Sequence, residues 1–214
     1  MAVIHRTTMS PQQARTAYRL VADSAVVSRR RARPRLSKAG GFRLDDPAGA
    51  VGIEFVLVND DAGPEPITYH VPLTYRGAPL DGADDALVGT SMHGVLGQRW
   101  IYDATRDPVA IAQIVALLAG QAQPQAQGMS DTPDPSVVSV GEFPSTATQF
   151  RSAADTPTNT AISVGSGRSV RVERVLRPEP ATPASDQTDA VRVSVPWQIG
   201  NGSTVRGVVL AIST

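Results

Sequence analysis

The chain has 214 residues and a mass of 22.5 kDa, which is enough for one domain, or two small ones, with a hydrophobic core. Its 20 basic and 20 acidic residues cancel, so no overall field attracts nucleic acid or an anionic membrane. The lack of cysteine excludes disulfides, thiolate nucleophiles and cysteine-bound metals. With no apolar run long enough for a signal peptide or a membrane span, we expect a soluble cytoplasmic protein that binds neither nucleic acid nor membrane.

Strand patterns dominate residues 41–107. Residues 51–60 alternate between apolar and other side chains, and Asp and Gly residues follow them, which predicts a strand and a turn. Residues 67–75 also alternate, but Pro72 cannot donate a ladder hydrogen bond, so we place this strand at an edge or a bulge. A third strand is expected at 98–103.

One helix is predicted at about 108–119. Asp107 is a good N-cap residue, Pro108 suits the first helical position, and Gly120 ends the apolar run. Because Gln113 is the one polar residue inside it, the helix should be largely buried against a sheet.

The second half of the chain reads as a polar linker at 121–136, followed by a β-rich section at 137–214. Within that section, residues 141–165 are rich in Ser and Thr and weakly patterned. The Asn201–Gly202 pair predicts a terminal hairpin. Strands are expected within residues 169–176, 190–200 and 203–212. The fold class predicted from these patterns is α+β, rich in antiparallel strands, with one buried helix.

Four segments together resemble a known family. They are KAGGFRLDDPAGAVGIEFVLVND, YHVPLTYRGAPLDGADDALVGT, HGVLGQRWIYDATRDPV and QAQPQAQGMSDTPDP, between Lys38 and about Asp134. They are similar to stand-alone bacterial proteins that carry a maltokinase N-terminal cap-like domain. The resemblance implies a curved sheet with helices and a core at 38–120. It also implies an accessory role in α-glucan, maltose–trehalose or glycogen metabolism.

Kinase activity does not follow from the resemblance. The sequence has no phosphate-cradling glycine loop leading into a helix, no ion-pairing lysine strand and no metal-binding catalytic loop. We therefore expect a non-catalytic protein without a cofactor, which does not phosphorylate maltose with ATP. Its expected partner is an α-glucan-metabolising enzyme or an oligosaccharide.

Residues 1–37 depart from the family pattern. Relatives have an amphipathic segment rich in Leu and Trp where this chain has QQARTAYRLVADSAVVSRRRARPRL at 12–36. Back-translated with permissive codons from Gln13 and read one base later, this chain can spell KLELLTGWLPTQPWYRG, the family pattern. One hypothesis is therefore a frameshift over about 13–35, which the nucleotide sequence would test.

The basic run inside this segment has two other interpretations. RRRARPR can be a solvated charged loop or an arm that binds phosphates, although the chain lacks the wider basic field that such arms accompany. The apolar residues of the segment also have helical potential. They are Tyr18, Leu20, Val21, Ala25 and Val26.

Aromatic and cationic side chains gather between residues 69 and 108. Aromatic faces can stack on sugar rings, although the same side chains also serve core packing. The candidate binding residues are Tyr75, Arg76, His93, Arg99, Trp100 and Tyr102. The Trp197–Gln198 pair near the C-terminus has the same two interpretations.

A small enzyme is the alternative function. Its site would use His93, Asp103 and Asp107 at the junction between a strand and the helix. No nucleophile accompanies these residues, and a structural His93 is the simpler interpretation. The other candidates are weaker, because adjacent carboxylates point apart on a strand and the histidines lack metal-ligand spacing. These are the Asp84–Asp85 pair, His5 and His70, and the 165–169 turn.

Overall fold

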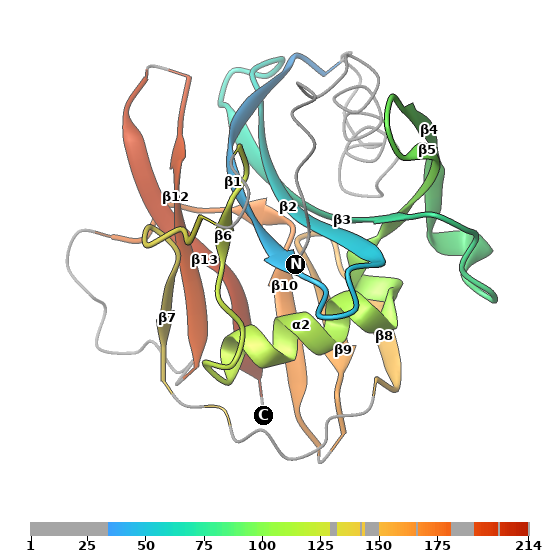
Figure 1. Cartoon of the computed structure of the whole chain (residues 1–214). Coiled ribbons are helices and arrows are strands. Elements are labelled where there is room, and N and C mark those ends of the chain that lie inside the picture. The colour runs from blue at the N-terminus through green and yellow to red at the C-terminus, as the bar shows by residue number, and fades with distance from the viewer. Residues whose placement is uncertain are drawn as a thin grey trace.

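The computed structural model describes residues 34–128, 132–141, 143, 150–165, 167–180, 191–200 and 202–213. These residues form two antiparallel sheets and one α-helix (Figure 1). The predicted α+β class therefore holds in its coarse form, although strands predominate. The segment for which a frameshift was predicted lies outside the described residues, apart from Pro34 and Arg35, and that hypothesis stays a prediction.

The first sheet has seven strands. Its order is β4-β5-β3-β2-β1-β6, and β11 pairs with β3 beside this path. The bounds are β1 (Leu36–Asp45), β2 (Val51–Asp60), β3 (Ile67–Arg76), β4 (Leu87–His93), β5 (Gly97–Asp103), β6 (Gln125–Ala126) and β11 (Val175–Leu176). Short 3-10 turns, η1 (Asp84–Ala86) and η2 (Ala104–Arg106), precede β4 and follow β5.

The second sheet has six strands in the order β7-β12-β13-β10-β9-β8. The bounds are β7 (Val138–Val140), β8 (Ser152–Asp155), β9 (Asn159–Ser163), β10 (Ser169–Glu173), β12 (Arg192–Gln198) and β13 (Thr204–Ser213). The predicted terminal hairpin is confirmed, because the consecutive strands β12 and β13 pair in antiparallel register.

The α-helix of the described residues, α2 (Pro108–Leu118), forms where it was predicted. The Asp107 carboxylate caps it by accepting a 2.9 Å hydrogen bond from the Val109 N–H, and Pro108 occupies the first turn. Gly120, at a φ of 70°, follows its last turn, and the Gly120 N–H donates to the Leu117 carbonyl. Six of the helical residues are buried, as its nearly continuous apolar sequence requires.

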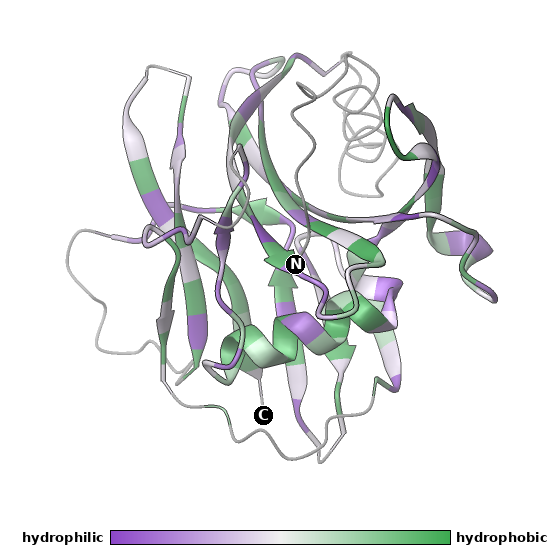
Figure 2. Ribbon diagram, viewed as in Figure 1, coloured by the Kyte–Doolittle hydropathy of each residue, from purple (hydrophilic) through white to green (hydrophobic). Residues whose placement is uncertain are grey.

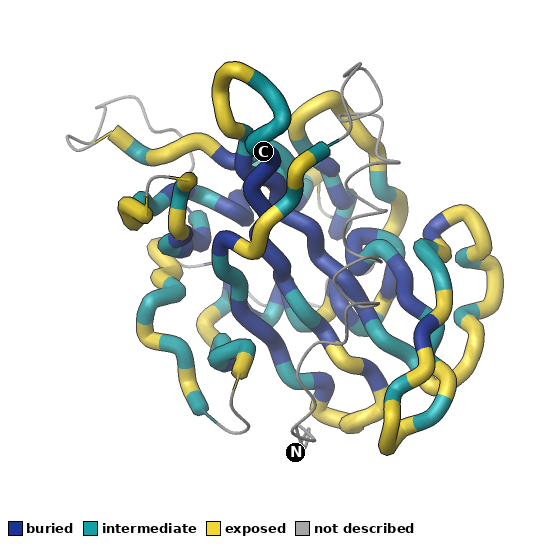
Figure 3. The backbone as a smooth tube through the Cα atoms, turned by 90° about the horizontal axis from the view of Figure 1, so that it is seen from above, coloured by how far each residue is buried: buried dark blue, intermediate teal, exposed yellow. Residues whose placement is uncertain are grey.

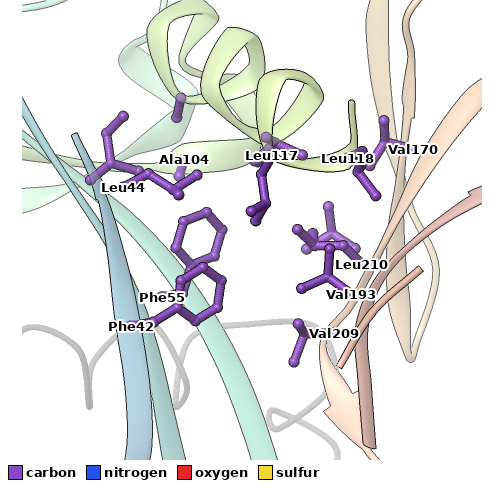
Figure 4. Close-up of a cluster of buried hydrophobic side chains, with 14 of the residues drawn as sticks. Phe42, Leu44, Phe55, Ala104, Leu117, Leu118, Val170, Val193, Val209 and Leu210 are labelled. Atoms are coloured by element: carbon purple, nitrogen blue, oxygen red, sulfur yellow. The ribbon is translucent and has the colours of Figure 1, made fainter. Parts of the chain in front are cut away.

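The main core lies between the two sheets and α2 (Figure 4). One face of β2 contributes Val51, Ile53, Phe55 and Leu57, because alternate residues of a strand share a face. The rings of Phe42 and Phe55 stack with centroids 4.4 Å apart. The helix adds Leu117 and Leu118, and the second sheet adds Val170, Val193, Val209 and Leu210. The C-terminal sheet therefore packs on the N-terminal one. In Figure 3, long stretches of the strands are coloured as buried.

The structure corrects the placement of β3. The proline was expected to put this strand at an edge or a bulge, yet β3 lies between β2 and β5 and pairs with β2 without a register shift. The His70 N–H donates to the Arg174 carbonyl, on the side away from β2, and the N–H groups of alternate residues point the same way. Pro72 lies between the residues of β3 that pair with β11 and those that pair with β5, so an N–H at Pro72 would point into the space between these two strands. No ladder bond is lost there.

Several strands were not predicted individually, among them β4, β6, β8 and β9. Residues 121–136 were expected to form a polar linker, but Gln125 is buried and pairs with Arg43 as part of β6. Strand β4 continues the antiparallel order beyond β5. Strands β8 and β9 fall in the weakly patterned 141–165 region and complete the edge of the second sheet.

Candidate functional site: the β4–β5 arm

Strands β4 and β5 form a hairpin, here called the arm (residues 87–103), that extends past the rest of the first sheet. Its pairs run from Leu87↔Tyr102 to His93↔Gly97, with a register shift after Leu87. Strand β3 pairs with β5 at residues 100–103 and ends at Arg76. The arm beyond Trp100 therefore has no strand beside β5 other than β4 among the described residues.

Large apolar side chains are exposed at the tip of the arm. Met92 is 74% exposed, Val95 62% and Leu96 46%, and Leu87 at the base is also exposed. Figure 2 shows the hydrophobic colour at this tip. Single exposed apolar residues are ordinary on a protein surface, but a group of them on one projecting hairpin is typical of an interaction surface.

The six predicted binding residues lie on or next to the arm, but on two faces of the sheet. Paired residues of an antiparallel ladder share a face. The Arg76↔Trp100 and Thr74↔Tyr102 pairs place Arg76, Trp100 and Tyr102 on the side of the main core. The Tyr75↔Ile101 and Ser91↔Arg99 pairs place Tyr75 and Arg99 on the opposite side. The six residues therefore cannot line one pocket.

Arg76 is held by a buried carboxylate. Its Nε and Nη2 donate to the two carboxylate oxygens of Asp107 at 2.7 and 2.6 Å, and Asp107 is 0% exposed. Burial alone would raise the pKa of Asp107, but the hydrogen bonds and charge of Arg76 outweigh it and hold that pKa below its ordinary value. The Arg76 pKa is raised by the same bonds. This pair fixes the start of α2 against the end of β3.

The two tyrosines are also engaged within the fold. The Tyr102 hydroxyl accepts a 2.9 Å hydrogen bond from the Leu80 N–H, and its ring is buried. The Tyr75 hydroxyl lies 3.4 Å from the Glu54 carboxylate, to which it donates. Removal from water, together with the Glu54 charge, raises the Tyr75 pKa well above its ordinary value, and removal from water also raises the Glu54 pKa. Of the predicted aromatic residues, half-buried Trp100 is the one left for stacking.

The alternative catalytic set is not assembled. The Nδ1 atom of His93 accepts hydrogen bonds from the N–H groups of Val95 and Leu96 at 3.3 and 3.2 Å, which shapes the turn at the tip. Asp103 lies at the other end of β5, six residues from the Gly97 that pairs with His93. At roughly 3.3 Å per residue, this separation is about 20 Å. His93 therefore cannot share a reacting atom with Asp103 or Asp107.

Asp103 belongs instead to a polar network that sequence reasoning missed. The Arg174 Nη2 donates to Asp103 at 2.6 Å and to the Thr105 hydroxyl at 3.0 Å, and its Nε donates to the Thr160 hydroxyl at 2.9 Å. Asp155 accepts from Thr160 at 2.7 Å and from Arg106 at 2.6 Å. Arg174 stands between β10 and β11, where the chain passes from one sheet to the other, so the network joins the two sheets.

His70 and Trp197 have structural places, whereas His5 lies outside the described residues. His70 is buried, with its Nδ1 2.8 Å from the Glu173 carbonyl, and burial lowers its pKa to about 3. Trp197 is buried in the main core. Across the described part of the chain, no group of three His, Asp or Glu side chains could hold a metal ion. No described helix is long and apolar enough to cross a membrane.

The comparison with protein families covers the part of the chain that builds the five longest strands of the first sheet. Residues 27–107 match the family model described as the maltokinase N-terminal cap domain, whereas no curated protein matches the chain. The match includes β1 to β5 and η2 and ends at Asp107, so α2 and the second sheet lie outside it. The resemblance to the maltokinase N-terminal cap domain that the sequence indicated is thus confirmed for residues 27–107.

Proposed function

We propose that this protein is a non-catalytic accessory module of α-glucan metabolism that binds a partner enzyme through the tip of the arm. The exposed apolar group of Met92, Val95 and Leu96 is the observation that carries this proposal. Burying side chains of this size stabilises a complex by roughly 1.5–3 kcal/mol each. The lack of cysteine suits a protein of the reducing cytoplasm, where we place it.

The edge position of β4 supports the same proposal. Strand β4 ends the order of the first sheet, and among the described residues no strand pairs with its outer side. The N–H and C=O groups of such an edge can accept a strand from another protein, while side-chain contacts provide specificity. The arm therefore combines main-chain hydrogen bonding with an apolar tip, as partner-binding edges do.

Binding of an oligosaccharide is the second candidate, and half-buried Trp100 is its support. Sugar rings stack on aromatic faces, and hydrogen-bonding groups beside the ring fix their orientation. Arg76 lies directly opposite Trp100, but Asp107 already occupies both ends of its guanidinium fork. Fewer donors remain for sugar hydroxyls than a carbohydrate site usually offers, so we favour the protein partner.

A double substitution at the tip tests the proposal. We expect Met92→Asp/Leu96→Asp to weaken partner binding at least tenfold, because two charges then replace buried apolar contact. The matched control is Val138→Asp/Val140→Asp, which places two charges on exposed apolar residues of β7 in the second sheet. Biolayer interferometry would use a purified maltokinase catalytic domain, a glycogen phosphorylase and a glycogen-branching enzyme as probes.

The same experiment includes maltoheptaose and glycogen. If the chain binds these glucans, and Trp100→Ala removes this binding while the tip variant keeps it, the oligosaccharide function replaces the one proposed. If the tip variant and the β7 control bind the enzyme probes equally well, the arm is not the binding surface.

A further inference from the structure

The tip of the arm carries a sulfur atom. The chain has no cysteine, and Met92 is the one methionine among the residues that the structure describes. Met92 is 74% exposed, more than any other exposed large apolar side chain of those residues. It lies near the end of β4 and pairs with Gln98 of β5. Its thioether is therefore the one oxidisable sulfur in the described part of the chain, and it lies on a projecting hairpin.

Nothing in the described fold shields this thioether from a dissolved oxidant. Met92 belongs to neither apolar cluster. Among the described residues, no strand pairs with the outer side of β4. The other two tip residues, Val95 and Leu96, are exposed as well, so they do not enclose it. Because exposure of the sulfur governs how fast a methionine is oxidised, Met92 should react almost as fast as a free methionine side chain.

We propose that Met92 is a site of reversible oxidation, where a peroxide converts the thioether into a sulfoxide and so prevents partner binding by the arm. The sulfur lone pair attacks one oxygen of hydrogen peroxide, an S–O bond forms and the O–O bond breaks. Sulfur loses two electrons, and the proton of the transferred oxygen passes to the departing hydroxide, which leaves as water. A methionine sulfoxide reductase reverses the change, because two thiols become a disulfide and the oxygen leaves as water.

The oxidation alters the surface of the arm but not its fold. A sulfoxide is polar and its oxygen accepts hydrogen bonds, whereas the thioether is apolar. In the free protein this oxygen is hydrated, and the exposed Gln98 amide, directly across the strand pair, can donate to it. In a complex the same oxygen would be buried against apolar side chains without a donor, which opposes binding. This last step rests on the proposed function, whereas the oxidation itself does not.

The rate of oxidation tests the site without any partner. Hydrogen peroxide is added to the full-length protein at neutral pH, and mass spectrometry of its peptides follows the oxidation of Met92. We expect a rate constant within about threefold of that of N-acetylmethionine amide, because the side chain is exposed. A rate constant below this range would show that Met92 is shielded, and would overturn the proposal.

A matched variant separates Met92 from the other methionines of the chain. Met92→Leu keeps an apolar side chain of similar volume without sulfur, while the other methionines remain in both proteins. On hydrophobic interaction chromatography, peroxide should shorten the retention of the parent protein more than that of Met92→Leu, because the parent alone loses apolar surface at the tip. Peroxide should change the urea midpoints of the two proteins equally, because Met92 belongs to neither apolar cluster. Equal shifts in retention would overturn the proposal.

The three enzyme probes of the tip experiment then measure binding, after catalase has removed the peroxide. Each protein is compared with its own untreated sample. Peroxide should weaken binding by the parent about tenfold, and methionine sulfoxide reductase with dithiothreitol should restore it. Met92→Leu should show neither change.

The outcomes separate this proposal from the proposed function. If the untreated parent binds none of the probes, the proposed function fails, while the rate constant and the chromatography still decide whether Met92 is the oxidation site. If the untreated parent binds a probe, and peroxide changes its affinity no more than that of Met92→Leu, oxidation of Met92 does not control binding and the proposal is overturned.

Discussion

Replacing Arg76 by methionine is expected to lower the free energy of unfolding by about 3–5 kcal/mol, because it leaves the fully buried Asp107 carboxylate without its partner. Methionine keeps the apolar length of the side chain, so lost packing contributes little. The pKa of Asp107 should then rise, since burial acts on it without the opposing charge. Urea unfolding at neutral pH measures the loss.

A surface pair in the same region provides the control. Arg106 and Asp155 also form a 2.6 Å ion pair, but both side chains are partly exposed. Arg106→Met should therefore cost about 1 kcal/mol or less. In the double variant Arg76→Met/Asp107→Asn, a neutral amide still caps α2, and stability should recover in part. If Arg76→Met costs no more than Arg106→Met, the buried pair does not hold the end of β3 to α2 as described.

The elements predicted correctly are those whose signals are local. The alternation of residues 51–60 and the Asp107–Pro108 start of α2 lie within a few residues of the structure they determine. Strand β4 has no such signal. Its sequence, LVGTSMH, exposes Leu87 and Met92 and becomes a strand through its pairs with β5. A strand defined by its neighbour rather than by its own burial pattern cannot be recognised from a window of sequence.

The candidate site shows the same limit. Arg76 was predicted as a binding residue, and Asp103 and Asp107 as part of an alternative catalytic set, but each was judged without its partner. Arg76 lies 31 positions from Asp107, and Asp103 lies 71 positions from Arg174, so the fold alone brings each pair together. Once paired, these groups hold the sheets and the helix in place. The exposed apolar tip of the arm could not be recognised from the sequence, because an exposed methionine cannot be distinguished from a buried one until the fold is known.

The second large effect is a loss of stability in mild acid that depends on His70. This ring is 1% exposed and lies between Phe55, whose ring centroid is 5.8 Å away, and the Glu173 carbonyl, to which Nδ1 donates. Its Nε2 has no hydrogen-bond partner among the described residues, so a proton added there would be buried without compensation.

The sign follows from the two pKa values. In the folded protein the His70 pKa is lowered from 6.5 to about 3, mainly by burial, so the unfolded chain takes up a proton that the folded protein refuses. The contribution of neutral His70 to the free energy of unfolding is fully present above about pH 6.5 and is lost as the pH falls toward 3. Linkage gives a loss of about 2 kcal/mol between pH 7.5 and 5.

His70→Asn separates this proton effect from packing. The Asn amide can donate to the Glu173 carbonyl as Nδ1 does, but it does not titrate. The variant should be less stable at pH 7.5, because it removes a buried ring. Its free energy of unfolding should fall by about 2 kcal/mol less than that of the parent chain between pH 7.5 and 5. Urea unfolding at the two pH values is the measurement, and equal losses in the parent and His70→Asn proteins would show that His70 is protonated as readily in the folded chain as in the unfolded one.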